Sequence, residues 1–124
     1  MSTTTKAKTK HTFSRWRHGG YYVHSVRYPS GAIGCVSNNY TDRKWRIACD
    51  PRPFDEQPTF KTREQAADAE TKLVQIQHRL AYLRGEIEAE HMSYGEIAEL
   101  HNLAPFIDPT DTLLLEWAGV PESV

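Results

Sequence analysis

The sequence predicts an α+β fold in which a four-stranded antiparallel meander packs on one long α-helix, with two short helices at the C-terminal end. Three observations support this prediction. Residues 12–50 hold short runs of β-branched and aromatic residues between turn signals, which is typical of strands. Residues 62–91 carry apolar residues at alternating spacings of three and four, which indicates an amphipathic helix. Two helix-start patterns follow, at Ser93 and Asp108.

The length of 124 residues suits one domain with its own core. We expect a flexible basic tail over residues 1–11 and a single domain over 12–124, divided into a meander (12–61), the long helix (62–91) and a helical C-terminal part (93–120). Lysines near the N-terminus precede no apolar run, so we expect neither a signal peptide nor a membrane anchor. These features favour a cytoplasmic protein.

Strands are predicted at residues 12–18, 21–28, 32–38 and 44–50. Turns centred on Gly19-Gly20, on Ser30 and on Asp42 give a register that pairs Trp16 with Val23, Ser25 with Cys35, and Cys35 with Cys49. A register slip by one residue would exchange the faces of a strand. The predicted core face holds Trp16, Val23, Ile33, Cys35, Trp45, Ile47 and Cys49. The predicted open face holds Phe13, Arg15, Arg17, Tyr22, His24, Val26, Tyr28, Val36, Lys44 and Arg46.

The long helix is predicted to begin after Thr62, whose hydroxyl is placed to cap it. Its alanine-rich first turns suit close packing on the sheet. The coiled-coil-like seam from Leu73 to Ile87 needs a further partner, which is either the C-terminal helices or, in a homodimer, a second copy of the chain. Ser93 and Glu96 form a capping box for the next helix. The last helix is predicted over residues 109–118, with Asp108 at its start.

Charge is divided unequally along the chain. Residues 1–53 contain ten basic and two acidic residues, whereas residues 54–124 contain five basic and fourteen acidic ones. Such a division indicates either a basic surface for an anionic partner or two halves that neutralise each other in the fold.

The open sheet face is the strongest functional signal. Arginine and lysine bind phosphates, and aromatic rings stack on bases, so their alternation on one face predicts a nucleic-acid-binding surface. The competing interpretation is a solvated face without a ligand. The candidate nucleic-acid-binding residues are Arg15, Arg17, Tyr22, His24, Tyr28, Lys44 and Arg46.

The sequence contains no assembled catalytic motif, and we expect a non-enzymatic protein without a cofactor. His18-Gly19-Gly20 lacks an accompanying G-x-S-x-G motif and reads as a hairpin turn. Cys35 and Cys49 lack the close spacing of zinc ligands, so we expect packed thiols and no metal site.

The passage from Trp45-Arg46-Ile47 to Phe60-Lys61-Thr62-Arg63-Glu64-Gln65-Ala66 resembles the strand-to-helix passage of AP2-type and integrase arm-type DNA-binding modules. The resemblance covers about residues 12–75. It implies a sheet backed by one helix that reads DNA.

Several runs resemble small orphan accessory proteins of actinobacterial phages, among them residues 16–23, 27–31 and 115–121. This resemblance implies a phage protein acting in an infected cell, where binding and inhibition are common tasks. It carries no site residues. An alternative function is therefore an inhibitor or host-takeover (anti-defence) protein that binds a host protein through its acidic helical half. The anchors for such protein–protein interaction would be Leu113, Leu114 and Trp117.

Overall fold

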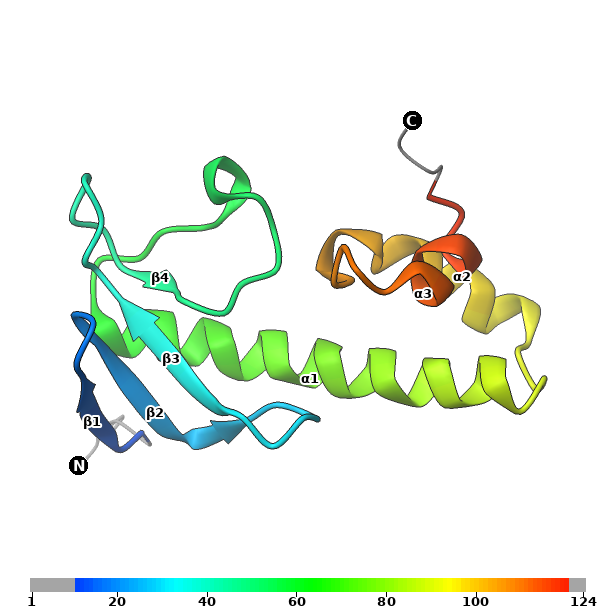
Figure 1. Cartoon of the computed structure of the whole chain (residues 1–124), viewed down its shortest axis with the longest axis horizontal. Helices are drawn as coiled ribbons and strands as arrows, with labels where there is room; N and C mark the ends of the chain where they lie inside the picture. The colour runs from blue at the N-terminus through cyan, green and yellow to red at the C-terminus, as the bar shows by residue number, and fades with distance from the viewer. Residues whose placement is uncertain (1–10, 121–124) are drawn as a thin grey trace, which may run out of the picture. The chain divides into compact units, whose positions relative to one another are not determined.

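The computed structural model describes residues 11–120 and confirms the predicted α+β class. Its contacts group into two compact units. We call residues 11–50 and 57–74 the sheet unit, and residues 51–56 and 75–120 the helical unit (Figure 1). The single domain expected from the chain length stays a prediction. No helix within residues 11–120 is long and apolar enough to cross a membrane.

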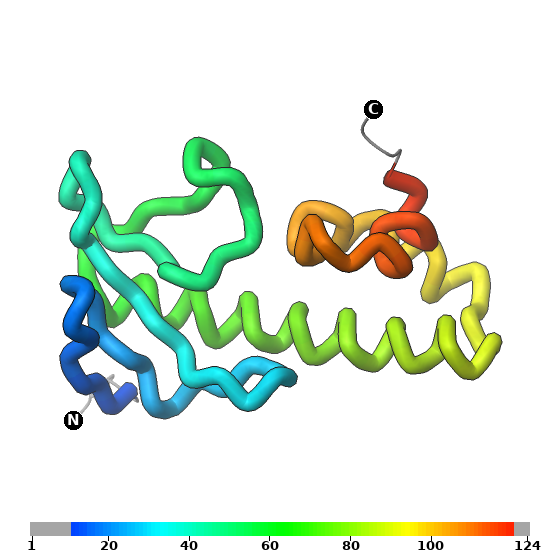
Figure 2. The backbone as a smooth tube through the Cα atoms, viewed as in Figure 1, coloured from blue at the N-terminus to red at the C-terminus, as the bar shows by residue number. Residues whose placement is uncertain are grey.

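The sheet unit contains the predicted four-stranded antiparallel meander, with strand order β1-β2-β3-β4. β1, β3 and β4 are shorter than expected, whereas β2 has the expected length, and the chain path between the strands is followed most easily in Figure 2. Their bounds are β1 (Phe13–Trp16), β2 (Gly20–Arg27), β3 (Ile33–Ser37) and β4 (Arg46–Ile47).

The register of the first hairpin differs from the prediction. Trp16 lies opposite Gly20 and Phe13 opposite Val23, so the predicted pair of Trp16 with Val23 is wrong. The turn consists of residues 17–19 and closes with the Gly19 N–H donating to the Trp16 carbonyl at 3.0 Å. Gly19 has φ 90°, the left-handed conformation that a three-residue hairpin turn needs at this place. The observed pairing of β1 with β2 differs from the predicted pairing by an odd number of residues, so the two faces of β1 are exchanged relative to the prediction.

The other two pairings also differ from the prediction. At the hairpin end Arg27 lies opposite Ile33, as a turn centred on Ser30 requires, but an irregularity between Val23 and Arg27 then shifts the register. Beyond it Cys35 lies opposite Tyr22, so the predicted pair of Ser25 with Cys35 is wrong. The predicted pair of Cys35 with Cys49 is wrong as well, because the Ala48 N–H donates to the Cys35 carbonyl at 2.8 Å.

The core of the sheet unit lies between the sheet and the first part of α1 (Arg63–Glu88). Thr62 caps this helix as predicted, its hydroxyl accepting from the Gln65 N–H at 3.0 Å. The face assignment needs correction, because Val26 and Val36 are buried and Phe13 packs against the core, although all three were expected on the open face. The buried members of this core are Val23, Val26, Val36, Ala66, Ala67 and Val74.

The helical unit covers the seam of α1 with the chain's own C-terminal part. Leu80, Leu83 and Ile87 are buried together with residues of α2 (Tyr94–Asn102) and α3 (Thr112–Trp117), and the turn η3 (Ala104–Phe106) packs against this core. The seam's Leu73 is buried as well. These apolar side chains are therefore satisfied within one chain and do not require a second copy. The short turn η2 (Phe54–Glu56) also belongs to this unit.

Two helix starts test the C-terminal predictions. The capping box of α2 is confirmed, with the Ser93 hydroxyl accepting from Glu96 N and the Glu96 carboxylate accepting from Ser93 N, each at 3.1 Å. The last helix begins later than predicted, at Thr112, because Asp111 is its cap and accepts from Leu114 N at 3.2 Å. Asp108 instead closes the preceding turn by accepting from the Thr110 N–H and hydroxyl, both at 2.8 Å.

The tail expected over residues 1–11 falls outside the described residues except for its last member. The ring of His11 is buried, with Nδ1 2.7 Å from the Ser25 hydroxyl and Nε2 2.8 Å from an Asp68 oxygen. His11 therefore belongs to the sheet unit.

Candidate functional site

The open face of the sheet unit is formed by β1 and β2, on the side opposite the α1-covered core. Because side chains alternate along a strand, the pairing of Ser14 with Tyr22 places these two on the same face, and Trp16 and His24 share it. The hydroxyl of Ser14 lies 2.7 Å from His24 Nε2, which holds the His24 ring over β1.

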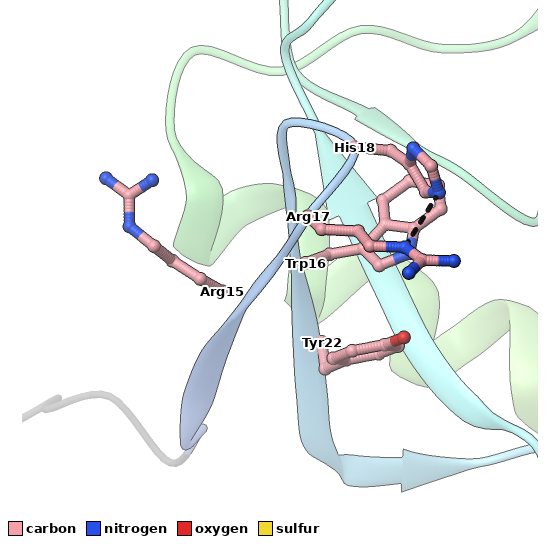
Figure 3. Close-up of a pocket in the computed structure, with 5 residues that line it drawn as sticks. All are labelled: Arg15, Trp16, Arg17, His18 and Tyr22. Carbon is pink, nitrogen blue, oxygen red and sulfur yellow. Dashed lines mark hydrogen bonds between the residues drawn. The ribbon is translucent and has the colours of Figure 1, made fainter.

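A hollow of about 500 Å³ lies at the turn end of this face. The Trp16 ring stands edge-on to the His18 ring, with centroids 5.0 Å apart, and its centroid is 6.4 Å from that of Tyr22. Arg17 joins them by donating from Nε to His18 Nε2 at 3.4 Å (Figure 3). The hollow is lined by Arg15, Trp16, Arg17, His18 and Tyr22. Three rings and a guanidinium thus gather at one opening.

Arg15 contributes to the wall of this hollow but points away from it. Figure 3 shows its side chain on the other side of β1 from Trp16, Arg17 and Tyr22. Its guanidinium lies 5.8 Å from the centroid of the Tyr21 ring, on the core side of the sheet. Arg63 covers the same ring at 4.9 Å. The odd register shift of β1 explains this separation of Arg15 from the other predicted residues.

Tyr28 is engaged in the interior. Its hydroxyl donates to Glu70 Oε2 at 2.6 Å, and the same oxygen accepts from the Cys35 N–H at 3.1 Å. Burial and the neighbouring carboxyl group raise the pKa of Tyr28 well above its usual value. Burial likewise raises the pKa of Glu70 to about 7, so this carboxyl group holds its proton into the neutral range.

Arg46 is buried and forms a two-pronged ion pair. Its Nη1 and Nη2 donate to the two carboxylate oxygens of Asp42 at 2.9 and 2.8 Å, and its guanidinium lies 5.2 Å from the Tyr40 ring centroid. The hydrogen bonds from Arg46 lower the pKa of Asp42 to about 2. In this arrangement Arg46 anchors the β3–β4 loop. Lys44 is exposed and lines a different hollow.

The structure therefore brings Arg17 and Tyr22 together, with His24 on the same face, and places Arg15, Tyr28, Lys44 and Arg46 elsewhere. Sequence reasoning missed Trp16, which it assigned to the core, and His18, which it read only as part of a turn. Trp16 was missed because the three-residue turn ending at Gly19 leaves it on the open face, whereas a turn centred on Gly19-Gly20 would place it in the core.

The two cysteines differ in environment. Cys35 is buried, and burial raises the pKa of its thiol to about 12, whereas Cys49 is exposed. A thiol with so high a pKa is a poor nucleophile and a poor metal ligand at neutral pH. Within residues 11–120 no group of three or more His, Cys, Asp or Glu side chains is arranged to hold a metal ion.

The predicted protein-binding anchors lie in α3 of the helical unit. Leu114 is buried and Leu113 packs against the same core, so both serve the interior. Trp117 is 39% exposed. Of the three, only Trp117 offers substantial surface to a partner.

Comparisons with protein-family models, with curated proteins and with solved structures find no match to this chain.

Proposed function

We propose that this protein is a small non-enzymatic binding protein whose sheet unit binds nucleic acid on its open face. The observation that carries the proposal is the hollow where the rings of Trp16, His18 and Tyr22 stand beside Arg17. Exposed rings stack on bases whatever their sequence, and a guanidinium binds phosphate.

The charge environment supports this proposal. Arg17 has no acidic partner among the side chains that the structure describes, and its hydrogen bond to His18 leaves most of its donors available. A phosphate would therefore meet no competing carboxylate.

The chemistry of the hollow favours binding over catalysis. No aspartate, glutamate, lysine or cysteine lines it beside His18, and the carboxyl group of Glu70 is held in the interior by Tyr28 and Cys35. General acid–base catalysis usually needs paired groups within reach of one substrate. In the phage context implied by the sequence resemblance, the ligand would be viral or host nucleic acid.

The test is the fluorescence anisotropy of labelled oligonucleotides titrated with protein at low salt. Tyr22→Leu should weaken binding about tenfold, because stacking of one base is worth about 1–3 kcal/mol. Tyr82→Leu is the matched control, since Tyr82 is 50% exposed in the helical unit and Tyr22 is 37% exposed. Equal affinities of the two variants, or no binding by the unmodified protein, would overturn the proposal. Circular dichroism checks that both variants fold.

A further inference from the structure

A second hollow, of about 570 Å³, lies in the sheet unit, and Lys44 is the one predicted site residue in its lining. Two chain segments form it, joined by a bridge in which Trp45 N donates to Phe60 O at 3.2 Å and Phe60 N donates to Trp45 O at 2.9 Å. Its lining contains three cations, two aromatic rings and no acidic residue: Asn38, Arg43, Lys44, Trp45, Thr59, Phe60 and Lys61.

Two of these cations, Lys44 and Lys61, lie across from each other, and their repulsion lowers the stability of the fold. The antiparallel bridge between Trp45 and Phe60 places Lys44, which precedes one, across from Lys61, which follows the other. Like charges directly across from each other are destabilising. Neither lysine side chain forms a hydrogen bond or ion pair with any residue in the described part of the chain.

Arg43 adds backbone strain to this charge repulsion. It has φ 61°, a left-handed conformation that glycine adopts freely and an arginine does not. Its N–H donates to the Tyr40 carbonyl at 2.9 Å, which closes the turn. A turn position that suits glycine thus carries a cation that faces a hollow lined with two others. A bound anion would relieve the repulsion among them.

The β3–β4 loop connects the linings of the two hollows. Asn38 lines the second hollow, and the next residue, Asn39, donates from its side chain to the carbonyl of His18 at 3.1 Å. His18 lines the first hollow. The Ser37 hydroxyl also donates to the Gly19 carbonyl at 3.1 Å. In Figure 1 the β1–β2 turn, the β3–β4 loop and the segment leading into α1 meet at the same end of the sheet unit.

We propose that the two hollows form one continuous track for single-stranded nucleic acid, an inference that rests on the function proposed above. Arg43, Lys44 and Lys61 contact the phosphates of one portion of the strand, and the rings of both hollows receive its bases. A single strand fits this arrangement because its base faces are free to stack, whereas a duplex hides them. Arg17 of the first hollow supplies a further cation for the phosphates of the strand.

The experiment compares oligo-dT and oligo-U of three and twelve nucleotides with a twelve-base-pair duplex, by anisotropy over a range of salt concentrations. The variants are the double substitution Lys44→Ala with Lys61→Ala, and Arg43→Gly. Lys72→Ala is the matched control, because Lys72 is exposed on α1 in the sheet unit and lines neither hollow.

The double variant should bind the twelve-nucleotide strand more weakly, with a slope of log affinity against log salt that is shallower by about 1.4, because each lost contact to a single strand contributes about 0.7. Affinity for the trinucleotide, which spans one hollow, should persist. Arg43→Gly should also weaken binding of the longer strand while its thermal stability is equal or higher. The oligo-dT and oligo-U arms show whether DNA or RNA is preferred.

Two results would overturn the track. One is unchanged binding of the twelve-nucleotide strand by both variants, and the other is duplex binding as tight as single-strand binding. Either result leaves the proposed function standing, provided that Tyr22→Leu still weakens binding. Absence of any oligonucleotide binding at low salt would overturn both proposals.

Discussion

The helical unit pairs two of its arginines with carboxylates, whereas the two hollows of the sheet unit are lined by exposed cations and by no carboxylate. In the helical unit Arg79 donates to both carboxylate oxygens of Glu99, at 2.7 and 2.9 Å, and Arg84 pairs with Asp111 and Glu88. At the turn end of the sheet unit no acidic side chain lines either hollow, although four exposed cations lie there. These cations are Arg17, Arg43, Lys44 and Lys61.

This difference bears on the unequal charge of the sequence. In the acidic second half, three carboxylates form ion pairs with arginines of the same half: Glu99, Asp111 and Glu88. Within the sheet unit, Asp42 is committed to Arg46 and Asp68 to His11. These two carboxylates of the sheet unit are thus already paired, and neither lines a hollow that holds the exposed cations.

The largest effect is expected from breaking the core of the helical unit. Leu83 is fully buried there, and Leu83→Ala should lower the free energy of unfolding by about 2–5 kcal/mol, from lost burial and the cavity left behind. Urea denaturation measures this change. Oligonucleotide affinity of the folded protein should stay the same, and a loss of affinity in samples shown to be folded would contradict the division of roles between the units.

The free energy of unfolding should depend on pH because of one carboxyl group buried in the sheet unit. Glu70 is 0% exposed, and its pKa rises from 4.5 in the unfolded chain to about 7 in the fold. Between these values the folded state holds a proton that the unfolded state releases. The contribution of Glu70 to the free energy of unfolding therefore falls by about 3 kcal/mol as the pH rises from about 4.5 to 7. Glu70→Gln, which mimics the protonated group, should remove this part of the dependence.

Urea denaturation of both proteins between pH 4 and 8 tests the Glu70 prediction. The difference in unfolding free energy between the variant and the unmodified protein should grow in favour of the variant as pH rises. A difference that is constant with pH would show that Glu70 titrates normally in the fold.

Two glycines allow a direct comparison of packing in the two units. A methyl group at Gly34 in β3 would lie 2.6 Å from Glu70 Oε1 and 2.9 Å from Val26 Cβ, whereas at Gly85 in α1 it would meet nothing within 4 Å. Gly34→Ala should therefore destabilise the protein by about 1–3 kcal/mol. Gly85→Ala should stabilise it by about 0.5–1 kcal/mol, because alanine is the better helix former. Thermal unfolding measures both, and equal effects would refute the packing described for Gly34.

A small loss of stability is expected at the start of α2. Ser93→Ala removes the hydroxyl that accepts from Glu96 N and should cost about 1 kcal/mol. Ser93→Asp, which retains an acceptor, should restore most of this loss in the same denaturation experiment. Equal stability of the alanine variant and the unmodified protein would mean that the capping box contributes nothing.

The sequence predicted the element types well because local signals decide them. The cap at Thr62, the capping box at Ser93 and the apolar seam each depend on residues a few positions apart. The register was not predictable in the same way. Nothing local distinguishes a turn over residues 17–19 from one centred on Gly19-Gly20, and the irregularity between Val23 and Arg27 depends on how the sheet fits the helix.

The candidate site was only partly predictable, for the same reason. Arg17, Tyr22 and His24 were found because their residue types are informative, whereas Arg15 moved to the other face with the shift of β1. The role of Glu70 was hidden because a glutamate in a helix is usually solvated. Its spacing from Ala66 and Val74 places it on the buried face of α1, and this spacing was the available signal.

The most direct test of the central claim compares one arginine from each unit. Arg17→Ala removes an exposed cation without an acidic partner in the described chain, whereas Arg79→Ala removes one already paired with Glu99. Binding of a twelve-nucleotide single strand is measured for both as a function of salt. We predict that Arg17→Ala weakens binding and makes the salt slope shallower by about 0.7, and that Arg79→Ala changes neither. Equal effects of the two substitutions would contradict the claim that the sheet unit holds the nucleic-acid-binding surface.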